Sequence, residues 1–127
     1  MPGTQLFEYA VIRIVPRVER EEFLNVGVVL YCKDAAFLRV KYFVEENKLK
    51  ALCGATEIAQ LKQYLAAFEA ICNGNSNAGP IARLDAPSRF RWLTATRSTV
   101  VQTSRVHPGL CKDPSETLQR LYEQLVL

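Results

Sequence analysis

Three short apolar segments near the amino end constrain the fold more than any other feature of this sequence. They cover residues 6–15, 23–32 and 37–43, and they are rich in β-branched and aromatic residues. Segments of this length and composition favour β-strands over buried helices. The first is apolar on both faces, as in a central strand, whereas the third alternates apolar with basic side chains and so has one wet face. Short connections join the three segments, which predicts an antiparallel meander.

Two helices should follow the meander. A short helix is expected from about residue 46 to residue 53, because Gly54 suits the left-handed position after a helix end. A longer amphipathic helix should have Thr56 as its N-cap and end at Cys72. Its apolar residues recur at steps of three and four, which predicts one stripe against the sheet: Ile58, Leu61, Leu65, Phe68 and Cys72.

The region between this helix and the carboxyl end has weaker signals. Glycine, asparagine and proline in residues 73–80 predict a mobile loop. Residues 88–93 fit either a helical turn or an extended segment, and residues 98–104 predict a fourth strand. The His-Pro-Gly triplet at 107–109 predicts a break in the chain.

The last helix has strong start signals. Asp113 is the expected N-cap, Pro114 suits the first helical position, and Glu116 follows three residues after the cap. Its apolar residues form one stripe that must be buried against another element: Leu118, Leu121, Tyr122, Leu125 and Val126. We therefore predict one α+β domain over residues 1–127, with an antiparallel sheet of about four strands and helices packed on it. The sheet would be a three-strand meander plus one later strand.

The strand alternation also predicts where a groove could form. If the helix ending at Cys72 covers the face made by Leu24, Val26, Val28 and Leu30, then Asn25, Gly27 and Tyr31 point to the opposite face. The last helix would pack there. Where it leaves that face open, we expect a groove floored by Arg13, Asn25 and Tyr31 and rimmed by residues 91–98.

The composition excludes several classes of protein. The start lacks a basic region before its apolar stretch, and no run is long enough to span a membrane, so we expect a cytosolic protein that does not bind membranes. Four cysteines lie far apart without a C-x-x-C pair, and the chain has one histidine. This spacing does not suit a zinc site, and we expect reduced, mostly buried thiols, no metal and no cofactor.

Charge is unevenly distributed along the chain. Residues 83–112 contain one acid, Asp85, against six basic residues: Arg83, Arg89, Arg91, Arg97, Arg105 and Lys112. Such a segment suggests an anionic partner, and an ordinary solvated surface is the alternative.

Two long motifs resemble a known family. Residues 8–28, EYAVIRIVPRVEREEFLNVGV, are similar to the amino-terminal signature of the bacterial domain-of-unknown-function family 3037. Residues 89–93, RFRWL, resemble its second signature together with later positions: Arg97, Ser98, Thr99, Gln102, Ser104, His107, Gly109 and Leu110. The resemblance implies no reaction. It implies a possible partner, because members are commonly encoded beside kinase-like proteins of the HipA type.

Arg13 stands alone as a charge within the first predicted strand. A buried guanidinium without a partner is unfavourable by several kcal/mol, on the order given for buried ions, so Arg13 requires a carboxylate, a sheet edge or a ligand. The internal candidates are four acids: Glu8, Glu19, Glu21 and Glu22. In the second strand, Asn25 and Gly27 fall on the less apolar face, and the glycine indicates a β-bulge or a close approach by another group.

Two hypotheses for function follow from these residues. The first is a small accessory or interaction module that binds a partner protein or an anionic, phosphate- or nucleotide-like ligand through its basic half. Its candidate residues are Arg13, Asn25, Tyr31, Arg91, Trp92, Arg97, Ser98, Gln102 and His107. Arginine forks suit phosphate and aromatic faces suit bases, although Trp92 equally fits a core or loop anchor, and no nucleic-acid-binding signature is present.

The second hypothesis is a small hydrolase or phosphotransfer enzyme that uses Arg13, Arg97, Ser98 and His107. His107 is the sole histidine, and Ser98 and Ser104 are possible nucleophiles. No nucleophile elbow and no phosphate-binding lysine loop accompany them. This absence places binding ahead of catalysis.

Overall fold

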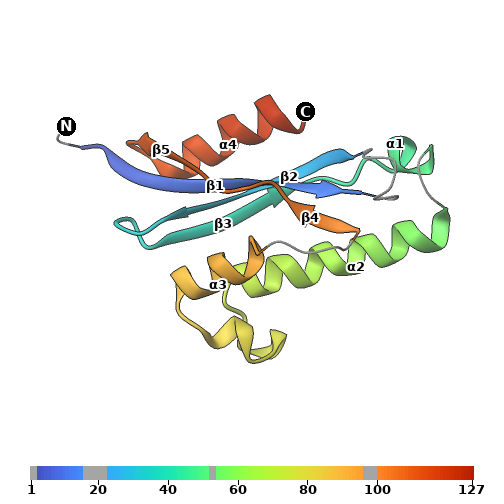
Figure 1. The fold of residues 1–127 in the computed structure, drawn as a ribbon, viewed down its shortest axis with the longest axis horizontal. Helices are drawn as coiled ribbons and strands as arrows, with labels where there is room; N and C mark the ends of the chain where they lie inside the picture. Colours follow the sequence, from blue (N-terminus) through green and yellow to red (C-terminus); the bar gives the residue numbers. More distant parts are fainter. Residues whose placement is uncertain (1–2, 16–22, 52–53, 96–99) are drawn as a thin grey trace.

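A computed structural model describes residues 3–15, 23–51, 54–95 and 100–127. Its centre is a five-stranded antiparallel sheet (Figure 1). The strands are β1 (Gln5–Ile14), β2 (Leu24–Cys32), β3 (Phe37–Tyr42), β4 (Val101–Thr103) and β5 (His107–Cys111). One edge of β1 pairs with β2, which pairs with β3, and the other edge pairs with β5 and then β4. The predicted α+β class and the antiparallel meander are confirmed.

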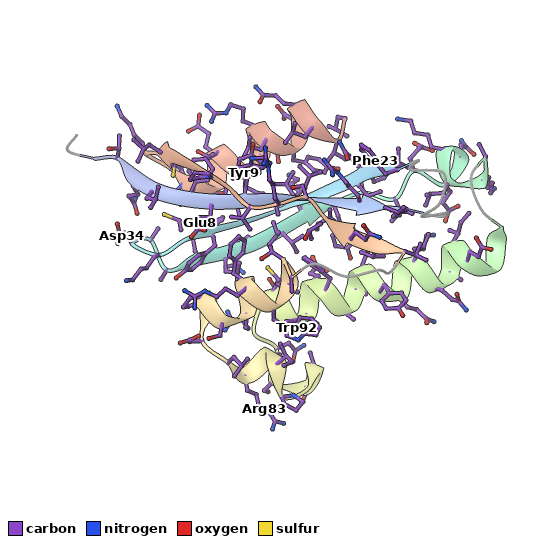
Figure 2. The ribbon with its side chains drawn as sticks, viewed as in Figure 1. Glu8, Tyr9, Phe23, Asp34, Arg83 and Trp92 are labelled. Atoms are coloured by element: carbon purple, nitrogen blue, oxygen red, sulfur yellow. The ribbon has the colours of Figure 1, made fainter. Side chains whose placement is uncertain are left out.

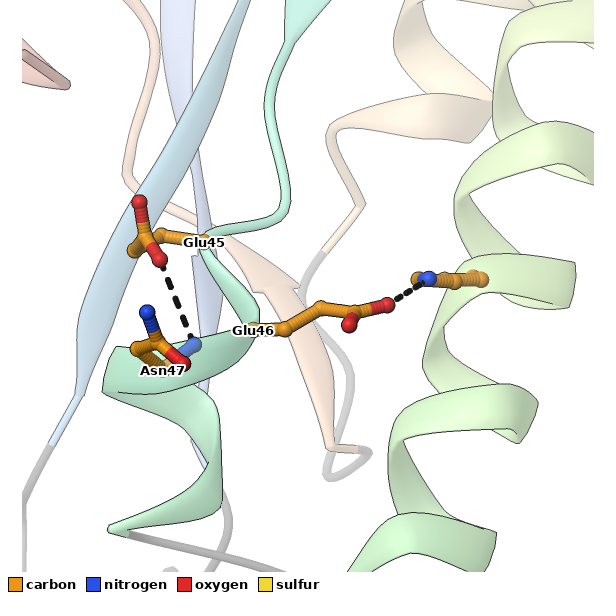
Figure 3. Close-up of polar contacts among 4 residues, drawn as sticks. Glu45, Glu46 and Asn47 are labelled. Carbon is orange, nitrogen blue, oxygen red and sulfur yellow. Dashed lines mark hydrogen bonds and ion pairs between the residues drawn. The ribbon is translucent and has the colours of Figure 1, made fainter.

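Helices cover both faces of the sheet. Figure 1 shows α2 (Ala55–Cys72) and α3 (Ala86–Leu93) on one side and α4 (Pro114–Leu125) on the other. Two 3₁₀ turns, Ser76–Ala78 and Ile81–Arg83, connect α2 to α3. The short α1 (Glu46–Lys50) starts with the Glu45 carboxylate accepting from the Asn47 amide at 3.2 Å, and a Glu46–Lys62 ion pair joins α1 to α2 (Figure 3).

The predicted stripe of α2 is buried, and that of α4 is buried except for Leu125 and Val126, which are half-buried. The α2 stripe packs on one face of the sheet in a core that includes Ile12, Val29 and Tyr31. From α4, Leu118 and Leu121 pack on the other face with Phe7, Val28 and Leu30. These two cores fix the sheet between two helical layers.

The helix starts are confirmed in one case and corrected in another. The Asp113 side chain accepts from the amides of Ser115 and Glu116, as predicted for α4. For α2, the predicted N-cap Thr56 was wrong, because the N-cap is Gly54, whose carbonyl accepts from the amide of Ile58 at 3.0 Å. The ambiguous residues 88–93 belong to α3, which the Asp85 side chain caps at the Ser88 amide.

The predicted chain break at residues 107–109 was wrong, since these residues open strand β5. Pro108 pairs opposite Glu8 in an edge strand, where a missing amide donor is tolerated. Gly109 lies under the Phe7 ring, and a Cβ there would approach that ring to 2.5 Å. Glycine is needed here for space and does not mark a turn.

A β-bulge in β2 corrects the predicted sheet faces. Ile12 pairs with Gly27 and Arg13 with Asn25, so Val26 is the extra residue of β2. Val26 therefore packs on the α2 side, whereas Val28 and Leu30 pack on the α4 side. The prediction that these three share one face was wrong because a bulge reverses the alternation on its far side. The bulge itself was predicted from the glycine.

Candidate functional site

Three polar side chains lie in a row across the α4 side of the sheet. Arg13 on β1 pairs with Asn25 on β2 and with Gln102 on β4. The side of the sheet on which Arg13 lies follows from the alternation along β1. The odd-numbered Phe7 and Tyr9 pack in the core beneath α4, whereas the even-numbered residues from 10 to 14 pack against α2. The row therefore joins one charged and two amide side chains from three adjacent strands. We call it the Arg13 row.

The Arg13 guanidinium lacks a carboxylate partner among the described residues. It lies over the Phe23 ring with its Cζ atom 4.5 Å from the ring centroid, and its Nε is buried without a hydrogen bond. Glu8 points to the opposite side of β1, where it lines another cavity, so this predicted pairing is wrong. Glu19, Glu21 and Glu22 lie outside the described residues.

Asn25 contributes a second unsatisfied atom to the row. Its Nδ2 donates to the backbone carbonyl of Leu125 at 3.1 Å, which ties the carboxyl end of α4 to β2. Its Oδ1 is buried and accepts no hydrogen bond within the described residues. Gln102, the third member of the row, already has an interaction partner. The row thus presents a donor on Arg13 and an acceptor on Asn25, both shielded from water.

This arrangement suits an oxyanion that also carries a hydroxyl. Arginine donates to phosphate or carboxylate oxygens through a planar fork, and the amide oxygen can accept from an O–H group. Buried polar atoms without partners are rare, and such atoms call for an explanation such as a ligand or an ion. A protonated phosphate offers both the oxyanion and the hydroxyl.

His107 lies on the same face but away from Arg13. It pairs with Tyr9 across the β5–β1 ladder, and their rings are 5.3 Å apart. Tyr9 precedes Arg13 by four residues, which is roughly 13 Å along a strand. The His107 ring is thus packed on Tyr9, whereas the Arg13 guanidinium lies over Phe23.

Ser104, a possible nucleophile in the sequence, has a structural role. Its amide donates to the Val11 carbonyl at 2.8 Å, and its Oγ accepts from the Val11 amide at 2.9 Å. The same hydroxyl donates to the Arg105 carbonyl at 2.9 Å. Ser104 thereby bridges the gap between β4 and β5 along β1, and its hydroxyl both donates and accepts a structural hydrogen bond.

Tyr31 and Arg91 lie on the other face of the sheet, so the predicted groove does not form as one site. Because of the bulge, Tyr31 points to the side opposite Asn25, and its ring packs on Phe90 of α3 with centroids 5.4 Å apart. Tyr31 and Arg91 line a cavity of about 340 Å³ together with five other residues. The structure therefore separates the candidates into two sites.

Trp92 lies in a third place. Its side chain is 38% exposed and lines an apolar cavity of about 370 Å³ with Tyr64 of α2 and Val101 of β4. Figure 2 shows Trp92 beside α3, far from Phe23, which lies at the α1 end of the sheet. Neither Arg13 nor Asn25 lines this cavity.

The described basic residues of the segment 83–112 make separate contacts. Arg83 and Arg89 hold the connection between α2 and α3 by donating to the carbonyls of Ser76 at 3.4 Å and Leu84 at 2.7 Å. Lys112 lines a cleft beside α4 that does not include Arg91. Arg97 and Ser98 lie outside the described residues.

Cysteine chemistry does not add to these sites. Cys32, Cys72 and Cys111 are free and buried, as predicted, and Cys53 lies outside the described residues. Burial raises the pKa of the Cys72 thiol to about 12 and, together with Cys32, raises the pKa of Cys111. Thiols with raised pKa values are poor nucleophiles. No cluster of three potential metal ligands occurs in residues 3–15, 23–51, 54–95 and 100–127.

Three contributing residues escaped prediction from the sequence. Phe23 was placed only at the start of a strand, yet its ring supports the Arg13 guanidinium. Glu8 and Asp34 line the cavity that holds Tyr31 and Arg91. Each is an ordinary strand or turn residue, so only the three-dimensional pairing of β1 with β2 shows its place.

Comparison with known proteins identifies a family. The family described as "Protein of unknown function (DUF3037)" matches residues 9–126. No curated protein and no solved structure matches the sequence. Among the described residues, none of the helices has both the length and the apolar character needed to cross a bilayer.

Proposed function

This chain belongs to the family of unknown function DUF3037, and we propose that it is a small interaction module that binds a phosphate-bearing partner or ligand at the Arg13 row. The observation that carries this proposal is the pair of buried, unpartnered atoms, Arg13 Nε and Asn25 Oδ1, on adjacent residues of β1 and β2. A ligand that satisfied both atoms would remove a penalty of about 1–3 kcal/mol for each.

Local electrostatics make Arg13 indispensable to this proposal. The carboxyl end of α4 lies beside Asn25 and carries partial negative charge, which opposes an anion. No lysine or arginine occupies the last turn of α4. A full guanidinium charge outweighs the partial charge of a helix end, about half a unit, and the other two members of the row, Asn25 and Gln102, carry no charge.

The partner suggested by the family resemblance, a HipA-type kinase-like protein, belongs to this proposal. A phosphorylated side chain or a bound nucleotide on such a partner would supply the phosphate. Co-purification of the two proteins, with and without Arg13→Gln, tests this part separately from binding of a small ligand.

The enzyme hypothesis has less support. His107 packs on Tyr9 while Arg13 lies over Phe23, and the Ser104 hydroxyl is committed to Val11 and Arg105. Arg97 and Ser98, its remaining members, lie outside the described residues. No observed pair within the described residues links a nucleophile to a base.

Calorimetric titration with inorganic phosphate tests the binding proposal. Arg13→Gln should abolish the heat of binding, and Arg13→Lys should retain a weaker signal, because lysine keeps the charge but loses the planar fork. Arg105→Gln is the matched control, since Arg105 is exposed and outside the row. Binding by Arg13→Gln equal to that of the unaltered protein would overturn the proposal, as would a lack of phosphate binding by the unaltered protein.

A further inference from the structure

The cavity on the α3 side of the sheet is a second candidate site, independent of the Arg13 row. It has a volume of about 340 Å³, near the lower limit of small-molecule pockets. Its lining comes from β1, the end of β2, the β2–β3 turn and α3: Leu6, Glu8, Tyr31, Lys33, Asp34, Pro87 and Arg91. Figure 2 shows Glu8 and Asp34 near each other at this end of the sheet.

Charges of both signs line the cavity without neutralising one another directly. Glu8 and Asp34 supply two carboxylates, and Lys33 and Arg91 supply two cations. In the described part of the chain, no ion pair joins any of these four side chains. They are therefore available to a ligand that carries one charge of each sign.

Tyr31 adds a polar group to the lining of this cavity. Its side chain is 8% exposed, its ring packs on Phe90, and its hydroxyl makes no hydrogen bond within the described residues. Burial raises the pKa of Tyr31, Asp85 and Glu8 raise it further, and Arg91 opposes them. The phenol consequently stays protonated at neutral pH, and its hydroxyl can both donate and accept a hydrogen bond.

We propose that this cavity binds a zwitterionic α-amino acid with an apolar side chain. The ammonium group would lie at Glu8 and Asp34, and the carboxylate would lie at Arg91 and Lys33 with a hydrogen bond from the Tyr31 hydroxyl. Leu6, which is 57% exposed, and Pro87 form the apolar part of the lining and would contact the ligand side chain. This assignment uses both signs of charge, the unpartnered hydroxyl and the small volume.

Calorimetry with L-leucine and two blocked derivatives tests the charge requirement. N-acetyl-L-leucine lacks the ammonium group, and L-leucinamide lacks the carboxylate. Each loss should weaken binding by about tenfold or more, because hydrogen bonds to charged groups contribute about 1.5–3 kcal/mol, and 1.4 kcal/mol is a factor of ten. Equal binding of N-acetyl-L-leucine would indicate a plain anion site and overturn the proposal, and so would no binding of L-leucine.

Variants locate the binding to this cavity. Tyr31→Phe keeps the ring on Phe90 and should weaken L-leucine binding by about three- to tenfold through loss of one hydrogen bond. Glu8→Gln should weaken it similarly or more. Tyr64→Phe, at an exposed tyrosine on α2 outside this cavity, is the matched control and should leave L-leucine binding unchanged. Thermal melting confirms that each variant is folded, and unchanged binding by folded Tyr31→Phe and Glu8→Gln would refute the assignment.

Discussion

Replacing Ser104 by alanine should destabilise the protein measurably although no large side chain is lost. The Ser104 Oγ is the acceptor for the Val11 amide at 2.9 Å, and this bond is buried between β1 and the β4–β5 connection. Alanine leaves that amide without an acceptor and also removes the donor to the Arg105 carbonyl. A buried amide without a partner is unfavourable by about 1–3 kcal/mol, so we expect a loss of about 2 kcal/mol in the free energy of unfolding.

Urea denaturation followed by circular dichroism measures this loss. For a chain of 127 residues, about 2 kcal/mol corresponds to a fall of about 8 °C in the melting temperature. Hydrogen exchange should show lost protection at the Val11 amide. Ser115→Ala is a matched control, because Ser115 is exposed on α4 and such changes usually stay within about 0.5 kcal/mol. If Ser104→Ala also changes the free energy of unfolding by less than about 0.5 kcal/mol, the bridging role of Ser104 is wrong.

Three further substitutions or treatments test the fold. Gly27→Ala should cost about 2–3 kcal/mol in urea denaturation, because the added Cβ would approach the Lys41 carbonyl and the Tyr42 Cβ to 2.7 Å; near-neutral stability would contradict the observed packing. Asp113→Ala should cost about 1 kcal/mol by the same assay through loss of the α4 cap, and an unchanged midpoint would argue against that cap. Burial raises the pKa of Cys72 from 9.0 to about 12, so its thiol should resist iodoacetamide at about pH 8 until urea unfolds the chain; rapid labelling of the native protein in mass spectrometry would contradict its burial. Because the thiol ionises more readily in the unfolded chain, the free energy of unfolding should decline as pH rises above the unfolded-state pKa.

The sequence allowed the fold to be predicted where periodicity and local chemistry agree. The alternating strands, the stripe of α2 and the Asp113–Pro114 start of α4 were each visible because their signals span only a few residues. Strand β5 was not predicted from the sequence, since proline and glycine usually mark turns. In this chain they suit an edge strand that passes beneath the Phe7 ring.

The candidate site was only partly predictable for a related reason. Arg13, Asn25 and Gln102 do lie together, and the exceptional charge at Arg13 was the informative signal. Tyr31 and Arg91 were assigned to the same groove, but the extra residue Val26 reverses the alternation between Asn25 and Tyr31. A single inserted position thus separates two sites. Sequence patterns indicate a bulge without fixing which residue it displaces.

The bulge also connects the fold to the proposed function. Without it, Asn25 would point toward α2 and could neither contact the carboxyl end of α4 nor stand beside Arg13. The same feature leaves Tyr31 facing α3, where it contributes to the cavity with Glu8 and Arg91. Two candidate sites on opposite faces therefore depend on one irregularity of β2.

The Nε–Hε resonance of Arg13, observed by NMR during titration with inorganic phosphate, tests the central claim most directly. This atom is the buried donor that the Arg13 row leaves without a partner. We predict that its signal shifts in a saturable manner and exchanges more slowly with water, while the Arg105 signal stays in place. An Arg13 signal that does not move, or that moves no more than that of Arg105, would contradict phosphate binding at the Arg13 row.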